Sequence, residues 1–186
     1  MFELLSSKAY EKPKMLKILS CSAAFLVAQI FPAALGAGGD ARTLSFFHTH
    51  TGKNLVVTYY EDGEYRPEGM AQLRQFLADW RNGQERDIDP QLMDILWEIH
   101  MSSRHMDTYE VISAYRSPAT NSLLRSKSNG VAKNSQHIPG KAIDVRLRGM
   151  ETSVLRDTAL ELKRGGVGYY AKSDFVHVDT GRVRRW

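Results

Sequence analysis

Three residues in the C-terminal third of the sequence have the types and spacing of a metal site. His137 lies just before a Gly turn, Asp144 lies in the middle of the apolar run that follows, and His177 lies in a later apolar run. Alternation along a strand places Ile143 and Val145 on one face and Asp144 on the other. Asp144 therefore needs a partner, because burying an unpaired charge costs a great deal of free energy.

The run that contains His177 repeats this arrangement. Its two valines face one side of the predicted strand, whereas His177 and Asp179 face the other. The polar faces of two such neighbouring strands converge on one point. Two imidazoles and one carboxylate suit a catalytic zinc ion whose fourth position is left for water. Zinc lowers the pKa of its bound water to about 7 and polarises a scissile carbonyl. We expect one Zn²⁺ per chain, held by His137, Asp144 and His177.

The alternative interpretation of these residues is a buried His–Asp pair with an unrelated second His. The cysteine count limits the chemistry further. Cys21 is the only cysteine and lies in the N-terminal segment described below. The remainder of the chain therefore offers neither a disulfide nor a thiolate nucleophile. Any metal must be held by His and carboxylate side chains, and hydrolysis must use activated water or a hydroxyl group.

Residues 1–36 have the order of a secretory signal peptide. Four lysines lead the segment, the apolar stretch Ile18–Phe31 follows, and small residues come after Pro32. The apolar stretch is short for a bilayer span, which needs about 20 residues. We therefore expect export and cleavage near Gly36 or Ala37, an uncleaved N-terminal anchor being the alternative, and no stable membrane span afterwards. Removing four lysines and two glutamates changes the formal charge from +4 to +2.

The rest of the chain, residues 37–186, has the pattern of one domain. Its apolar and charged fractions are those of a globular protein, and no linker divides it. Helical patterns come early and strand patterns cluster late, which predicts an α+β fold with a small, mainly antiparallel sheet, flanking helices and a zinc cleft on the sheet. The predicted strands are 44–47, 55–60, 109–114, 141–147, 166–170 and 174–179, and the predicted helices are 70–83, 90–99, a short one from 118, and 153–164.

Two motifs carry a resemblance to a known group of enzymes. The run Ser135–Asp144 resembles the S-x-H-x-x-G-x-A-x-D signature of the lysostaphin, D-Ala-D-Ala peptidase and hedgehog-type zinc metallopeptidases. Residues 175–179 are similar to the C-terminal metal strand of that group, and residues 113–117 resemble its arginine motif. As a whole, residues 37–186 resemble the murein endopeptidase K-like subfamily.

This resemblance implies an exported zinc endopeptidase that cleaves peptide crosslinks of peptidoglycan, in particular 3–3 crosslinks of the L,D type between meso-diaminopimelate residues. It makes Arg116 a catalytic and substrate-binding residue, because the matching arginine faces the substrate and can stabilise an oxyanion. The alternative for Arg116 is a structural ion pair. Tyr115 belongs to the same motif and is expected to bind substrate. Ser135 is expected to orient His137 or to bind substrate, and a cap of its own loop is the alternative.

The general base has two candidates. Many relatives place a carboxylate three residues before the last metal-binding His, and Asp174 lies there. Strand alternation instead puts Asp179 on the face of His177. Asp174 needs a bend at the start of the strand to reach the water, whereas Asp179 suits the second ring nitrogen of a ligand. We expect Asp174 to be the base and Asp179 to support a ligand.

Two other functions remain open at this stage. One is a zinc carboxypeptidase that removes terminal D-Ala, and the other is a non-catalytic wall-binding module of the same fold. In each case the partners are peptidoglycan peptide stems in the periplasm. The short basic cluster at residues 182–185 lacks interleaved aromatic residues, so no nucleic-acid partner is expected. The sequence does not fix the oligomeric state.

Overall fold

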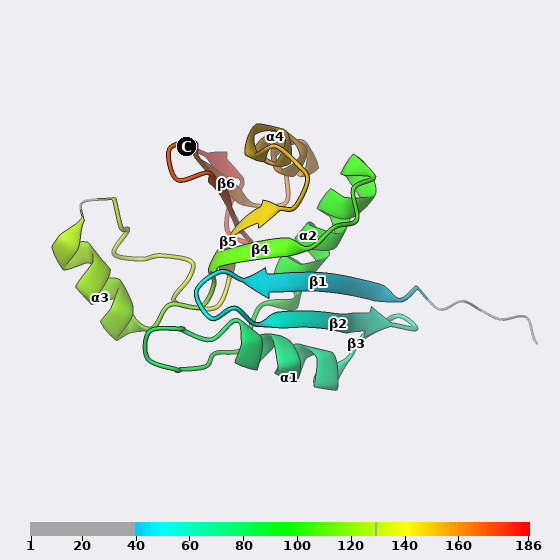
Figure 1. The fold of residues 1–186 in the computed structure, drawn as a ribbon, viewed down its shortest axis with the longest axis horizontal. Helices are drawn as coiled ribbons and strands as arrows, with labels where there is room; N and C mark the ends of the chain where they lie inside the picture. The colour runs from blue at the N-terminus through cyan, green and yellow to red at the C-terminus, as the bar shows by residue number, and fades with distance from the viewer. Residues whose placement is uncertain (1–39, 129) are drawn as a thin grey trace, which may run out of the picture. The chain divides into compact units, whose positions relative to one another are not determined.

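A computed structural model describes residues 40–128 and 130–186 of the protein (Figure 1). The predicted signal peptide, residues 1–36, lies outside the described residues. The described residues belong to one compact unit. In the described part of the chain, no helix has the length and apolar character that crossing a bilayer requires.

The fold is built on one eight-stranded sheet, whose strands lie in the order β3-β2-β1-β4-β5-β7-β6-β8. The strands are β1 Arg42–His48, β2 Asn54–Glu61, β3 Glu64–Tyr65, β4 Tyr109–Ser113, β5 Ala142–Leu147, β6 Gly166–Tyr170, β7 Phe175–Asp179 and β8 Arg184–Arg185. The prediction of a small, mainly antiparallel sheet is wrong, because the sheet is mixed. β1 pairs with β4 in parallel, and β6 pairs with β8 in parallel.

Both parallel pairs arise from connections that local sequence patterns do not reveal. Parallel neighbours need a crossover rather than a tight turn. The chain leaves β1, forms β2, β3 and two helices, and then returns beside β1 as β4. At the other edge the chain passes from β7 around β6, and the two-residue strand β8 adds to the far side of β6.

Four helices of the described residues accompany the sheet, which makes the α+β part of the prediction correct. They are α1 Pro67–Phe76, α2 Pro90–Ser103, α3 Pro118–Lys127 and α4 Thr152–Leu162. The predicted starts of α2 and α3 are confirmed, since Asp89 and Ser117 accept hydrogen bonds from backbone N–H groups in the first turns. α1 ends earlier than expected, because the carbonyl of Asp79 accepts from the N–H of Gly83 and closes a separate turn.

The hydrophobic core lies on one face of the sheet. The alternating apolar residues of β5 and β7, such as Val145 and Val176, are fully buried there together with Leu92 and Leu96 of α2 and Leu155 of α4. Figure 1 shows α2 and α4 together beside the central strands, with α3 standing apart on a loop that leads back to β5. The opposite face of β5 and β7 is consequently not covered by α2 or α4 and can carry polar groups.

Candidate metal centre

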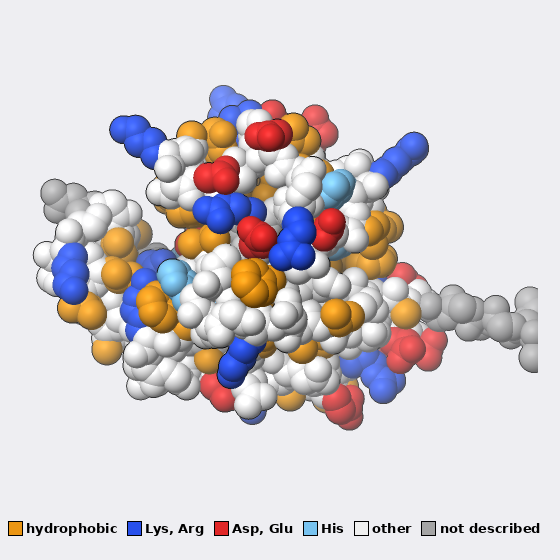
Figure 2. Space-filling model, in the orientation of Figure 1, with side chains coloured by type: hydrophobic (Ala, Val, Ile, Leu, Met, Phe, Trp, Pro, Cys, Tyr) orange, Lys and Arg blue, Asp and Glu red, His pale blue; other side chains and the backbone are white. Residues whose placement is uncertain are grey.

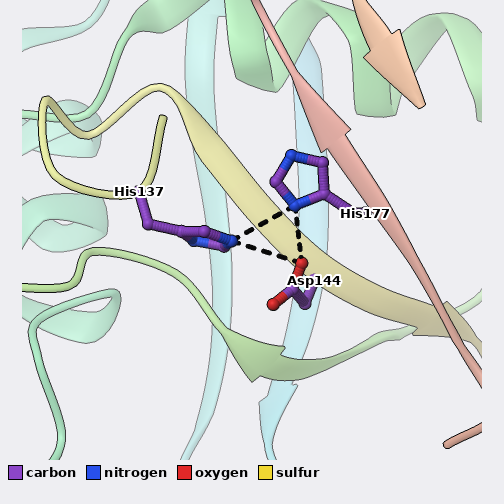
Figure 3. A group of neighbouring side chains, drawn as sticks. All are labelled: His137, Asp144 and His177. Atoms are coloured by element: carbon purple, nitrogen blue, oxygen red, sulfur yellow. Dashed lines mark hydrogen bonds and ion pairs between the residues drawn. The ribbon is translucent and has the colours of Figure 1, made fainter. Parts of the chain in front are cut away.

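His137, Asp144 and His177 converge on one point (Figure 3). His137 Nε2 lies 3.3 Å from Asp144 Oδ1 and 3.2 Å from His177 Nδ1, and His177 Nδ1 lies 2.8 Å from Asp144 Oδ1. All three side chains are buried. Within residues 40–128 and 130–186, they are the group of His and acidic residues whose geometry could hold a metal ion.

Strand pairing and one turn produce this convergence. β5 and β7 are antiparallel neighbours, and Asp144 pairs directly with His177 across them. His137 comes from the preceding loop, which Gly140 turns back toward β5 with a φ of +74°. A Cβ atom on Gly140 would lie 2.3 Å from the carbonyl oxygen of Asp87, so both backbone conformation and space require glycine there.

The far ring nitrogens of both histidines are held by acceptors. His137 Nδ1 donates to the carbonyl oxygen of Ala114 over 2.7 Å, and His177 Nε2 donates to Asp179 Oδ2 over 2.9 Å. These bonds leave His137 Nε2 and His177 Nδ1 with their lone pairs facing a carboxylate oxygen. Three acceptors at such short range repel one another unless a proton or a cation lies between them.

The spacing of these three atoms fits zinc. Bonds of about 2.0–2.1 Å in a tetrahedral zinc site place neighbouring ligand atoms about 3.3 Å apart. The three distances here are 2.8, 3.2 and 3.3 Å. The donor set of two imidazole nitrogens and one carboxylate oxygen is that of catalytic zinc sites, which retain an open position.

Electrostatics in the site favour a cation as well. Burial by itself raises the pKa of Asp144, but the two imidazoles outweigh burial and hold that pKa below its usual range. Burial lowers the pKa of His137, which keeps that ring neutral. Burial also opposes charge on His177, yet the carboxylates of Asp144 and Asp179 raise its pKa. The carboxylates of Asp144 and Asp179 therefore make the pocket favourable for a positive charge.

The carboxylate of Asp179 is surrounded by hydrogen-bond donors from four residues. Its Oδ1 accepts from the backbone N–H groups of Gly166 and Gly181, and its Oδ2 accepts from His177. Arg184 donates to both oxygens, over 2.9 and 2.6 Å. With this side chain 0% exposed, no lone pair of Asp179 remains for a water molecule in the cleft.

Asp174 lies at the bend before β7, with a φ of +49°. The expected bend exists, but the carboxylate turns toward α4, where its Oδ1 accepts from the hydroxyl of Thr152 over 2.7 Å. Arg146 also pairs with it, at 3.3 Å from Oδ2. The side chain is 63% exposed and is absent from the lining of the cleft, although the next residue, Phe175, lines it.

The group of His137, Asp144 and His177 opens into a cleft of about 380 Å³. One side of this cleft is polar and includes Arg116 and Ser135. Arg116 Nη2 lies 4.0 Å from Asp144 Oδ2, and its other contacts, to Asn121 and Ser113, are long at 3.5 Å. Ser135 Oγ accepts from the N–H of His137 over 3.3 Å while its hydroxyl remains beside the cleft.

Tyr115 lies elsewhere. Its side chain is buried in the hydrophobic core and does not line the cleft, and its N–H donates to the carbonyl of Leu77. Three aromatic residues also line the cleft, namely Tyr170, Phe175 and Trp186. The sequence interpretation considered Tyr170 for the cleft but favoured the sheet core, and it assigned no role to Phe175 or Trp186. The alternation that places Phe175 on the face of His177 was a usable signal for that residue. No local signal indicates Trp186.

Figure 2 shows the distribution of charge on one face of the molecule. Basic and acidic side chains are interspersed there, with hydrophobic side chains between them. A continuous basic surface of the kind that follows a nucleic-acid backbone is not seen on this face.

The chain is similar in sequence to one family of known proteins. Residues 36–186 match the protein family described as "Peptidoglycan L,D-endopeptidase MepK". The chain is 37% identical over 173 residues to a protein of that name from Escherichia coli K12, which covers 91% of this chain and 95% of the relative. It is 40% identical over 147 residues to a "Probable peptidoglycan L,D-endopeptidase MepK" from Haemophilus influenzae, which covers 78% of each chain. No solved structure matches the sequence significantly.

Proposed function

The chain belongs to the peptidoglycan L,D-endopeptidase MepK family, and we propose from this membership that it hydrolyses peptide bonds of peptidoglycan with one bound Zn²⁺. The observation that carries the proposal is the cluster at the base of an open cleft. There, His137 Nε2, His177 Nδ1 and Asp144 Oδ1 turn their lone pairs toward one point. A divalent cation is the partner that three such acceptors lack.

His137, Asp144 and His177 are the proposed zinc ligands. Zinc bound there supplies an activated water and polarises the scissile carbonyl. The protein contributes the orientation of the ligands: the Ala114 carbonyl fixes the ring of His137, and Asp179 fixes the ring of His177. Asp179 is therefore a positioning residue in this proposal.

Arg116 and Ser135 are the proposed substrate contacts. The guanidinium of Arg116 is largely buried beside the cluster, and its Nε has no hydrogen-bond partner within the described residues. Its Nη1 and Nη2 make only long contacts of 3.5 Å, to Asn121 and Ser113, so these two donors are available to the oxygen of the scissile carbonyl as negative charge develops there. Tyr115, which is buried next to Arg116, would act by holding the end of β4 rather than by touching substrate.

Asp174 is the proposed general base. Asp179 has no free lone pair, whereas Asp174 is largely exposed and directly precedes a cleft residue. To accept a proton from the attacking water, its side chain must leave the hydroxyl of Thr152 and turn toward the cleft. Asparagine at position 174 would keep the shape and remove the basicity, so a loss of about 10²-fold or more in rate at full zinc occupancy is expected.

The proposed substrate is the L,D crosslink between two diaminopimelate residues, as the names of the relatives and the likeness to their subfamily suggest. That substrate lies in the periplasm. Residues 1–36 are proposed to be the signal peptide that delivers the chain there, and residues 37–186 the zinc peptidase domain. After cleavage of the signal peptide, no membrane-spanning segment would remain.

Digestion of purified peptidoglycan tests the proposed function. Wild-type protein with zinc should convert crosslinked dimers to monomers in mass spectra of the fragments, and a chelator should abolish the conversion. Asp144→Ala should lose zinc and activity, whereas Asp157→Ala, which removes an exposed carboxylate from α4, should lose neither. Shortened stems with intact dimers would indicate a carboxypeptidase. Retention on the wall without any cleavage would indicate a binding module.

A further inference from the structure

The cleft beside the metal cluster has two chemically different sides. The polar side carries Arg116 and Ser135. The opposite side includes Tyr170, Phe175 and Trp186, which we call the aromatic wall, and Arg184, whose guanidinium lies 4.8 Å from the centroid of the Trp186 ring. Tyr170 and Phe175 stack across the β6–β7 hairpin with ring centroids 4.6 Å apart. The indole of Trp186 lies 5.2 Å from the ring of His177.

Trp186 is held rigidly in this wall. Its Nε1 donates to the hydroxyl of Tyr170 over 2.9 Å, and its backbone pairs with Val167 and Tyr169 of β6. Its ring lies flat over Gly168, because a Cβ atom there would lie only 2.6–2.8 Å from three indole atoms. Gly168 in turn pairs with His177 across β6 and β7. The wall is therefore preformed next to the metal cluster.

The wall is also exposed. Trp186 is 50% exposed and Tyr170 is 37% exposed, although both are fixed in place by hydrogen bonds. Fixed aromatic surface beside a polar catalytic group is the usual composition of a ligand site. A ligand that meets both sides must present polar groups to Arg116 and an apolar chain to the aromatic wall.

We propose that the aromatic wall is a specificity subsite that packs against the methylene chain of the crosslinking diamino acid, while Arg116 and Ser135 hold its amide oxygens. This inference rests on the proposed function. A diamino acid joined through its side chain has both features: a short run of methylene groups and a polar group at each end. Small stem residues such as alanine offer too little apolar surface to use the wall.

Trp186→Ala tests the subsite. We expect KM for a crosslinked muropeptide to rise about tenfold, because the methylene contacts with the indole face are lost. The kcat value and the zinc content should stay within about twofold, because no zinc ligand changes. Trp186→Phe restores a flat ring and should bring KM back to within about threefold of wild type. Trp80→Ala is the matched control, since Trp80 is 37% exposed but lines a different pocket.

Gly168→Ala gives an independent test. It leaves Trp186 in the chain but displaces the indole, so it should raise KM about as much as Trp186→Ala does. In the Trp186→Ala background the three indole atoms nearest to the new methyl group are gone, so the second change should add little further effect. Such non-additive effects on KM are expected only if Gly168→Ala acts by displacing the indole of Trp186.

The outcomes separate the subsite from the proposed function. Failure of the zinc-loaded wild type to cleave crosslinked muropeptides would overturn both. Cleavage by wild type with an unchanged KM for Trp186→Ala, or an equal rise in KM for Trp80→Ala, would overturn the subsite alone. A rise in KM confined to Trp186→Ala and Gly168→Ala, with zinc retained, would support it.

Discussion

Replacing Asp179 by asparagine should lower both the stability of the protein and its affinity for zinc. Five donor bonds reach the carboxylate, from His177, Gly166, Gly181 and twice from Arg184. No acceptor surrounds it. An asparagine side chain has one acceptor oxygen and an NH₂ group, and that group must face donors whichever way it is turned.

The size of the effect follows from what is left unpaired. Arg184, whose side chain is 30% exposed, loses its charged partner, and His177 or the two glycine N–H groups lose an acceptor. Breaking a buried pair in this way costs about 3–5 kcal/mol. For a unit of this size the Tm should fall by about 6–20 °C. The ring of His177 also loses its support, so zinc affinity should fall about 10–100-fold.

Thermal unfolding and zinc competition with a chelator measure the two effects, and Asp174→Asn is the matched control. Asp174 is 63% exposed and loses only its contacts with Thr152 and Arg146. Its stability should change by less than about 1 kcal/mol and its zinc affinity should stay the same. An Asp179→Asn variant with the Tm and zinc affinity of wild type would refute this view of Asp179. Normal rates for Asp174→Asn at full zinc occupancy would refute its role as base.

Three further predictions concern the metal site and its surroundings. Zinc at about 100 times its Kd should stabilise the protein by about 2.7 kcal/mol, and calorimetry should show no such gain for His137→Ala. Gly140→Ala should cost about 1–3 kcal/mol in urea unfolding and weaken zinc binding, since a side chain at φ +74° is strained and meets Asp87. Burial raises the pKa of Asp179, but His177 and Arg184 outweigh it and hold that pKa below its usual range. The metal-free protein should therefore lose stability below about pH 4, and Asp179→Asn should lose less over the same range.

The faces of the strands were predictable from the sequence. Alternation placed Asp144 opposite to Ile143 and Val145, and it placed His177 opposite to its neighbouring valines; the register of β5 against β7 brings the two polar faces together. The starts of α2 and α3 were predictable for a similar reason. Each depends on a cap residue followed by proline, which acts within a few residues of the chain.

Strand order and the surroundings of the polar groups were not predictable in this way. β1 lies beside β4, and β8 lies beside β6, because packing against helices and edges far apart in the sequence selects those partners. The direction of Asp174 depends on Thr152, and the enclosure of Asp179 depends on Arg184. Each of these contacts joins segments that local patterns do not relate.

The sequence by itself determined which face of β5 and of β7 carries Asp144 and His177, because side-chain alternation depends only on the geometry of a single strand. Tertiary structure alone decided what those residues meet. Trp186 joins the cleft only because β8 pairs in parallel with β6 and Gly168 leaves room for its ring. Such neighbours are selected by the free energy of packing the whole domain, which no short stretch of sequence encodes.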